Sequence, residues 1–186
     1  MNNDYITVYD NAVDSKKCDD LIEFFEYNKS HSFKKEDEVR SFQELSFQIF
    51  PDKEKQISDL LVPFVERYKQ DNSISDLVWP ETYELEFTRF KKYLPNTNDR
   101  FDLHADATMP TTCSRFLVMF VYLSDNESGH TSFPGRDIKI QPKKGRLLMF
   151  PPNWCYPHVG EKVTDKPKYI LGNYCRYLGR YVDPKA

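Results

Sequence analysis

The sequence predicts a mainly β protein with flanking helices. Helical periodicity is confined to the first third of the 186 residues, short strand-like segments follow Trp79, and aromatic residues reach 15%. Short strands separated by Gly and Pro predict a sandwich or barrel, and helices that precede them predict packing on one face of an antiparallel sheet. We expect one domain over residues 1–186, with helical support over about 1–78 and a β core over about 79–180.

Two helices are expected in the first third. Ser15 is the predicted cap of the first helix, and Asp52 lies near the predicted start of the second. Pro63 is expected to kink or split the second helix, because proline lacks the backbone donor. The charged run 34–38 is expected to be a solvated loop. The first helical stripe consists of Cys18, Leu21, Ile22 and Phe25.

The strand predictions begin where apolar and polar residues alternate at Tyr83, Leu85 and Phe87. Residues 115–123 are almost continuously apolar, which predicts a strand buried on both faces. Turn signals containing Gly or Pro separate the remaining candidates. These further strands are expected at residues 138–141, 146–150 and 169–178.

Charge and hydropathy limit the classes of partner. The net charge of −3 and the lack of a strongly basic stretch argue against nucleic acid as a partner. Residues 1–10 lack the apolar segment of a signal peptide, and the longest apolar run, 116–123, is far below the roughly 20 residues of a membrane span. We therefore expect a cytoplasmic protein without membrane contact. The four cysteines lack a Cys-x-x-Cys pair and are expected to be free, and the oligomeric state is left open.

A metal site is predicted at Leu103-His104-Ala105-Asp106 together with His158. Alternate residues of a strand point to one face, so His104 and Asp106 can reach the same ion. Two histidines and one carboxylate form the facial triad of non-haem Fe(II) oxygenases, which leaves open positions for co-substrate and O₂. The competing interpretation is an exposed polar pair, because a His-x-Asp motif alone is weak.

Lys168 is a candidate for binding a ligand beside this metal site. It lies ten residues beyond His158, so a short turn between two strands would bring its ammonium group deep into a barrel. There it would bind the distal carboxylate of a diacid. A surface lysine is the alternative, since Lys162 and Lys166 are nearby.

These residues occur together with several short motifs across nearly the whole chain. Residues 101–106 read aromatic-x-x-His-x-Asp. The other motifs are Arg115, Tyr122-Leu123-Ser124, Gly129-His130-Thr131-Ser132-Phe133-Pro134, Pro142-Lys143-Lys144-Gly145, Met149-Phe150, His158-Val159-Gly160 and Lys168-Tyr169. In this combination the chain resembles the catalytic domain of prolyl 4-hydroxylases, within the 2-oxoglutarate/Fe(II) dioxygenase superfamily.

The resemblance implies a double-stranded β-helix (jelly roll) with supporting helices. It implies Fe(II) bound by His104, Asp106 and His158. It also implies that Lys168 binds the C5 carboxylate of 2-oxoglutarate with help from the Thr131 hydroxyl, and that ascorbate is an optional reductant.

Some positions depart from the family or have an open role. The family usually has a tyrosine on the strand entering the site; the corresponding residue here is Phe90, with Tyr93 as the alternative. Arg115 aligns with a family arginine that faces substrate, and its alternative is a surface charge at a strand end. Trp154 is a candidate wall of the substrate entrance, and its alternative is ordinary packing.

The expected function is hydroxylation of a C–H bond, with O₂ as co-substrate. A protein or peptide residue such as proline is the first candidate substrate, and a small molecule is another. The rival enzyme is a nucleic-acid demethylase of the AlkB type, which would use an arginine such as Arg176 for 2-oxoglutarate. A catalytically inactive jelly-roll binding module is the non-enzymatic alternative.

Overall fold

The computed structural model describes residues 4–178 and consists mainly of one curled antiparallel sheet. Its strands follow the order β1-β10-β7-β12-β5-β3-β6-β11-β8-β9, while β2 pairs with β3 and β4 pairs with β12. The jelly-roll prediction is confirmed. The strands are β1 (Thr7–Tyr9), β2 (Phe33–Glu36), β3 (Arg40–Ser46), β4 (Tyr83–Leu85), β5 (Arg89–Tyr93), β6 (Arg100–His104), β7 (Arg115–Tyr122), β8 (Thr131–Phe133), β9 (Ile138–Ile140), β10 (Arg146–Phe150), β11 (His158–Gly160) and β12 (Lys168–Tyr177).

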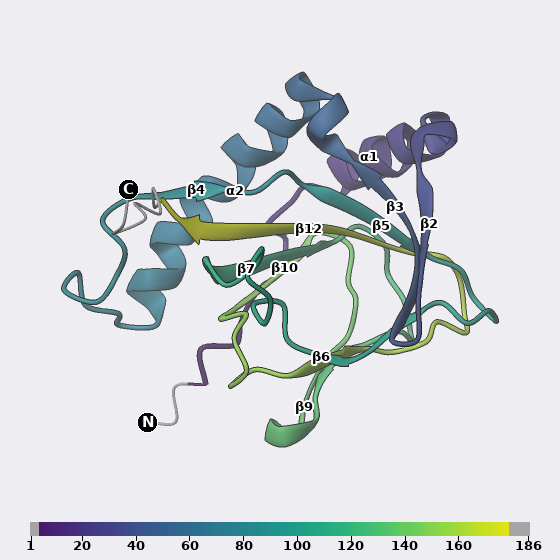
Figure 1. Cartoon of the computed structure of the whole chain (residues 1–186). Helices are drawn as coiled ribbons and strands as arrows, with labels where there is room; N and C mark the ends of the chain where they lie inside the picture. Colours follow the sequence, from purple (N-terminus) through teal and green to yellow (C-terminus); the bar gives the residue numbers. More distant parts are fainter. Residues whose placement is uncertain (1–3, 179–186) are drawn as a thin grey trace.

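Two helices cover one side of this sheet. Figure 1 shows α1 (Ser15–Tyr27) and α2 (Pro51–Asp71) on the side of β12 and β5, with β6 and β9 on the opposite side. Within residues 4–178, no helix has the length and apolar character needed to cross a membrane. Three short 3-10 helices complete the elements: Lys29–His31, Phe47–Ile49 and Pro134–Arg136.

The helix predictions are confirmed in position and corrected in detail. Asp14, not Ser15, caps α1, because its carboxylate accepts hydrogen bonds from the backbone N–H groups of Lys16 and Lys17 at 2.9 and 3.3 Å. Helix α2 runs without a break through Pro63. Pro63 lies on the exposed side of the helix, where water can satisfy the carbonyl group that loses its partner.

The first third of the chain also contributes β2 and β3, which the sequence did not indicate. The run 34–38, expected as a loop, is largely β2, and it forms a hairpin with β3. Strand β3 then lies between β5 and β6 in the sheet. It was missed because polar Ser41 and Glu44 are buried on its two faces, which hides the alternation of a half-buried strand.

Strand β7 lies between two hydrophobic cores. Leu117, Met119 and Val121 pack with the residues of the helices, while Val118, Phe120 and Tyr122 face a second core inside the curled sheet. The prediction of a strand buried on both faces is therefore confirmed. The strands expected near residues 83–87, 138–141, 146–150 and 169–178 are present as β4, β9, β10 and β12.

Candidate metal centre and the cavities beside it

Neighbouring strands bring the three predicted ligands together. Strand β6 ends at His104, β11 begins at His158, and the register of the two strands places these histidines opposite each other. Asp106 follows two residues after the end of β6. His104 Nε2 lies 3.6 Å from Asp106 Oδ1, and His158 Nε2 lies 3.4 Å from Asp106 Oδ2. One ligand atom from each residue lies within 4.8 Å of the others, which fits a shared ion.

Hydrogen bonds fix the orientation of the two imidazoles. The Nδ1 atom of His104 donates to the carbonyl of Asp102 at 2.7 Å, and the Nδ1 atom of His158 donates to the carbonyl of Tyr156 at 3.1 Å. Since Nδ1 carries the proton, Nε2 of each ring has its lone pair free toward Asp106. The His104 ring also stacks on Phe101, with ring centroids 3.4 Å apart.

The ligand atoms fit a divalent ion. Among residues 4–178, His158 Nε2 and Asp106 Oδ2 are buried without a hydrogen-bond partner, an arrangement that costs free energy unless a ligand satisfies them. Burial lowers the pKa of His158 to about 4, so the ring is neutral and able to bind metal at pH 7. Burial acts to raise the pKa of Asp106, but His104, His158 and Lys91 outweigh it and hold that pKa low. The donor set is that of a non-haem Fe(II) site.

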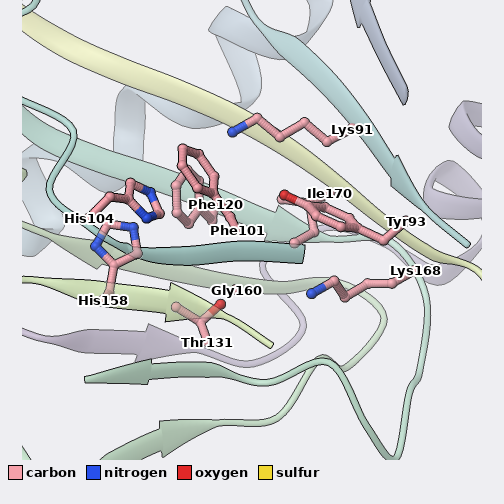
Figure 2. A pocket seen from close by; sticks show the side chains of 10 residues that line it. All are labelled: Lys91, Tyr93, Phe101, His104, Phe120, Thr131, His158, Gly160, Lys168 and Ile170. Carbon is pink, nitrogen blue, oxygen red and sulfur yellow. The ribbon is translucent and has the colours of Figure 1, made fainter. Parts of the chain in front are cut away.

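A first cavity extends from the two histidines into the curled sheet. Figure 2 shows the two histidines at one end of this cavity, Lys168 and Tyr93 at the other, and Thr131 between His158 and Lys168. The remaining lining residues are Lys91, Phe101, Phe120, Gly160 and Ile170. The structure thus brings the predicted lysine and threonine into the same space as the two histidines.

Lys168 is almost completely buried, with 1% of its surface exposed. Its ammonium group donates to the carbonyl of Gly129 at 2.6 Å and lies 4.5 Å from the centroid of the Tyr93 ring. Gly129 has φ of 71°, and a Cβ there would lie 2.8 Å from Val163, so glycine is required for this contact. Burial lowers the pKa of Lys168 to about 7. An ammonium with one neutral acceptor in such a place is suited to receive a carboxylate.

Tyr93, not Phe90, faces the first cavity. Strand β5 places alternate side chains on opposite faces, and Phe90 packs under the helices against Phe25 and Tyr169. Thr131 lines the cavity from the other side, where its hydroxyl accepts a hydrogen bond from Tyr122 at 2.6 Å.

A second cavity of about 330 Å³ adjoins His104 and Asp106, and it shares Lys91, Phe101 and His104 with the first. Arg115 lines it but is not a free surface charge. Its guanidinium makes two hydrogen bonds of 2.7 Å to Glu86, donates to the carbonyl of Asp106 at 3.0 Å, and lies 4.0 Å above the Tyr174 ring. Arg115 and Tyr174, which donates to Asp106 Oδ1 at 3.1 Å, therefore position the carboxylate.

Trp154 lies outside both cavities and is 79% exposed. It belongs to the loop between β10 and β11. This loop adjoins the ligand segment, because the carbonyl of Pro152 accepts hydrogen bonds from the backbone N–H groups of Asp106 and Ala107, both at 3.0 Å. The loop therefore contacts the ligand segment through Pro152, while Trp154 lines neither cavity.

The sequence interpretation missed Lys91 and Tyr174, which both lie beside the predicted ligands. Lys91 is 6% exposed and lines both cavities. Its signal was present in the alternation Arg89-x-Lys91-x-Tyr93, which places these three side chains on one face of β5. Tyr174 lies inside β12, where a tyrosine is an ordinary core residue.

Comparison with protein families places the chain among known sequences. Residues 88–176, which include all three predicted ligands, match the family model described as the 2OG-Fe(II) oxygenase superfamily. A search of curated proteins found no match.

Solved structures with the same fold include three prolyl hydroxylases. The viral collagen prolyl hydroxylase of Paramecium bursaria Chlorella virus-1, solved with 2OG, has 21% identity and a TM-score of 0.73, over 94% of this chain and 97% of that chain. A Pseudomonas putida prolyl-4-hydroxylase has 13% identity and a TM-score of 0.68, over 94% and 93% of the two chains. A prolyl hydroxylase from Trichoplax adhaerens, complexed with a hypoxia inducible factor peptide fragment, has 14% identity and a TM-score of 0.74, over 94% and 84%.

Proposed function

We propose that this chain, whose residues 88–176 match the 2OG-Fe(II) oxygenase superfamily, is an oxygenase of that superfamily and hydroxylates a residue of a protein or peptide, with proline as the first candidate. The observation that supports this proposal most strongly is that the cluster of His104, Asp106 and His158 adjoins two cavities, and that the buried Lys168 lines the first of them. Such a site can receive two different molecules on two sides of one ion.

His104, Asp106 and His158 would hold the iron through two neutral imidazoles and one carboxylate. When bound, the iron activates O₂ and couples the conversion of 2-oxoglutarate to succinate and CO₂ with oxidation of a substrate C–H bond. The protein holds the ligands in place: Asp102 and Tyr156 orient the imidazoles through their carbonyl groups, and Tyr174 holds one oxygen of Asp106.

The first cavity would bind 2-oxoglutarate. Lys168 would bind its C5 carboxylate through a charge-assisted hydrogen bond. The Thr131 hydroxyl would donate to the same carboxylate, since it already accepts from Tyr122 and keeps its own proton available. Phe101, Phe120 and Ile170 would exclude water from the chain of methylene groups between the two ends.

The second cavity would bind the substrate. Arg115 fixes the backbone at Asp106 and forms part of the wall, and Trp154 would contact a longer substrate at the rim. A peptide is supported by the Trichoplax adhaerens relative, which was solved with a peptide fragment. Arg176, the residue a demethylase of the AlkB type would need for 2-oxoglutarate, lines neither cavity and instead pairs with Glu84.

The test is turnover of defined substrates by the Fe(II)-loaded protein with 2-oxoglutarate and O₂. Proline-containing peptides, the same peptides with alanine in place of each proline, and methylated oligonucleotides are compared by mass spectrometry. We expect succinate and the gain of one oxygen atom on proline-containing peptides, with neither product from the His104→Ala variant. Demethylated oligonucleotides with unmodified peptides would refute the proposed substrate.

A further inference from the structure

Lys91 is a second buried ammonium group, and it has no anionic partner of its own. It projects from β5 and is 6% exposed. Within residues 4–178 it makes no hydrogen bond or ion pair, and its ammonium instead lies between 5.2 and 5.7 Å from the ring centroids of Phe42, Phe101 and Phe120. A buried charge without a hydrogen-bonded counter-charge is costly, so a ligand is the natural source of one.

The ammonium lies where the two cavities meet, close to the metal ligands. Lys91 lines both cavities, and Figure 2 shows its side chain extending across the top of the first one above Phe120. Lys91 lines the second cavity together with His104 and Asp106, whereas Lys168 lines only the first cavity. Lys91 thus lies next to the predicted metal ligands, while Lys168 lies at the far end of the first cavity.

The nearest carboxylates already have other partners. Glu44 lies opposite Lys91 in the β3–β5 register, but it pairs with Lys35 at 3.6 Å. Asp106 is a predicted metal ligand. Burial lowers the pKa of Lys91 to about 8, which still leaves most of the ammonium charged at pH 7.

Charge balance indicates which ligand supplies the missing anion. A divalent ion and Lys168 carry three positive charges, and Asp106 with the 2-oxoglutarate dianion carries three negative charges, so these groups are neutral together. Lys91 adds one positive charge. The cations that line the second cavity lead to the same residue. Lys35 pairs with Glu44, Arg40 pairs with Asp37, and Arg89 and Arg115 both pair with Glu86, so among residues 4–178 Lys91 is the lining cation left without an ion pair.

We propose that Lys91 binds a carboxylate of the substrate, so that the enzyme selects substrates with an acidic group next to the carbon that is oxidised. This inference rests on the proposed function and narrows its substrate class to acidic peptides. Lys91 is then a specificity-determining residue, and 2-oxoglutarate depends on Lys168 instead.

The test compares paired proline-containing peptides in which Asp or Glu beside the proline is replaced by Asn or Gln. Peptide binding to the anaerobic complex with Fe(II) and 2-oxoglutarate is measured by calorimetry, and turnover is measured separately. We expect the wild type to bind the acidic peptide at least about tenfold more tightly than the Asn or Gln peptide, because one hydrogen bond between charged groups typically contributes this much affinity. We expect Lys91→Met to bind both peptides equally and Lys91→Glu to prefer a peptide with Lys beside the proline.

Matched controls separate recognition from folding. Lys92→Met removes the neighbouring lysine, which faces the other side of β5 and pairs with Glu26, and it should leave the preference for the acidic peptide intact. Lys91→Met should have an unchanged or higher thermal midpoint without ligand, because it removes an unpaired buried charge.

Three outcomes would overturn the inference. The first is a wild type that binds acidic and amide peptides equally. The second is a Lys91→Met variant that keeps the preference. The third is a variant that loses 2-oxoglutarate affinity by the same factor as peptide affinity. A wild type that binds 2-oxoglutarate but hydroxylates neither peptide would instead refute the proposed function.

Discussion

The pH dependence of 2-oxoglutarate binding is the prediction that follows most directly from Lys168. Burial lowers the pKa of Lys168 to about 7 in the ligand-free protein, and only the protonated form can pair with the C5 carboxylate. Affinity should therefore be complete below pH 7 and fall as the pH rises through 7. Each pH unit above 7 costs about 1.4 kcal/mol, or roughly tenfold, so the loss between pH 6.5 and 8.5 is about 25-fold.

Calorimetry under anaerobic conditions measures this effect in two ways. The dissociation constant of 2-oxoglutarate from the Fe(II)-loaded protein is measured from pH 6.5 upward, where His158 is neutral and metal is retained. Buffers with different ionisation enthalpies report proton uptake, which should be about one proton per 2-oxoglutarate at pH 8. Lys168→Met should bind at least about tenfold more weakly and lose the pH dependence. A flat affinity profile in the wild type without proton uptake would refute the reasoning.

Three further experiments test other parts of the site. Asp106→Ala should reduce bound Fe(II) from one ion per chain to none with an unchanged circular dichroism spectrum, and retained iron would contradict the ligand assignment. Arg115→Met should lower the free energy of unfolding in urea by about 2–4 kcal/mol, because the largely buried Glu86 carboxylate keeps only one partner, Arg89. The control Lys55→Met, at an exposed ion pair, should change this free energy by about 0.5 kcal/mol or less. Phe90→Ala should lower the free energy of unfolding by about 3–5 kcal/mol, because Phe90 packs in the core. Tyr93→Phe should weaken 2-oxoglutarate binding without destabilising the fold, because Tyr93 lines the first cavity. Weaker 2-oxoglutarate binding in the Phe90 variant, with none in the Tyr93 variant, would contradict the assignment of Tyr93 to the cavity.

The sequence predicted the parts of the fold in which hydrophobic periodicity is undisturbed. The continuous apolar segment of β7 and the stripe of α1 were recognised because each faces packed hydrophobic side chains. Strand β3 was missed because its inward-facing residues line a cavity and include Glu44, so the usual apolar pattern is absent. Prediction from hydrophobic periodicity is expected to fail where polar side chains face a binding site.

The site was predicted by chemistry more than by spacing. The His104-x-Asp106 pair follows from strand geometry, but the register that places His158 opposite His104 depends on the pairing of β6 with β11, which no local pattern shows. Lys91 and Lys92 look like an ordinary exposed pair in the sequence. Only the fold distinguishes them, since one is buried between aromatic rings and the other pairs with Glu26 near the surface.

The central claim is that one ion held by His104, Asp106 and His158 works with a diacid held by Lys168. Quantifying succinate formed from 2-oxoglutarate, with and without added Fe(II), tests it most directly. We expect succinate formation that requires Fe(II) and O₂, and that is lost in His158→Ala. An iron-loaded, folded protein that neither binds 2-oxoglutarate nor forms succinate would contradict the claim.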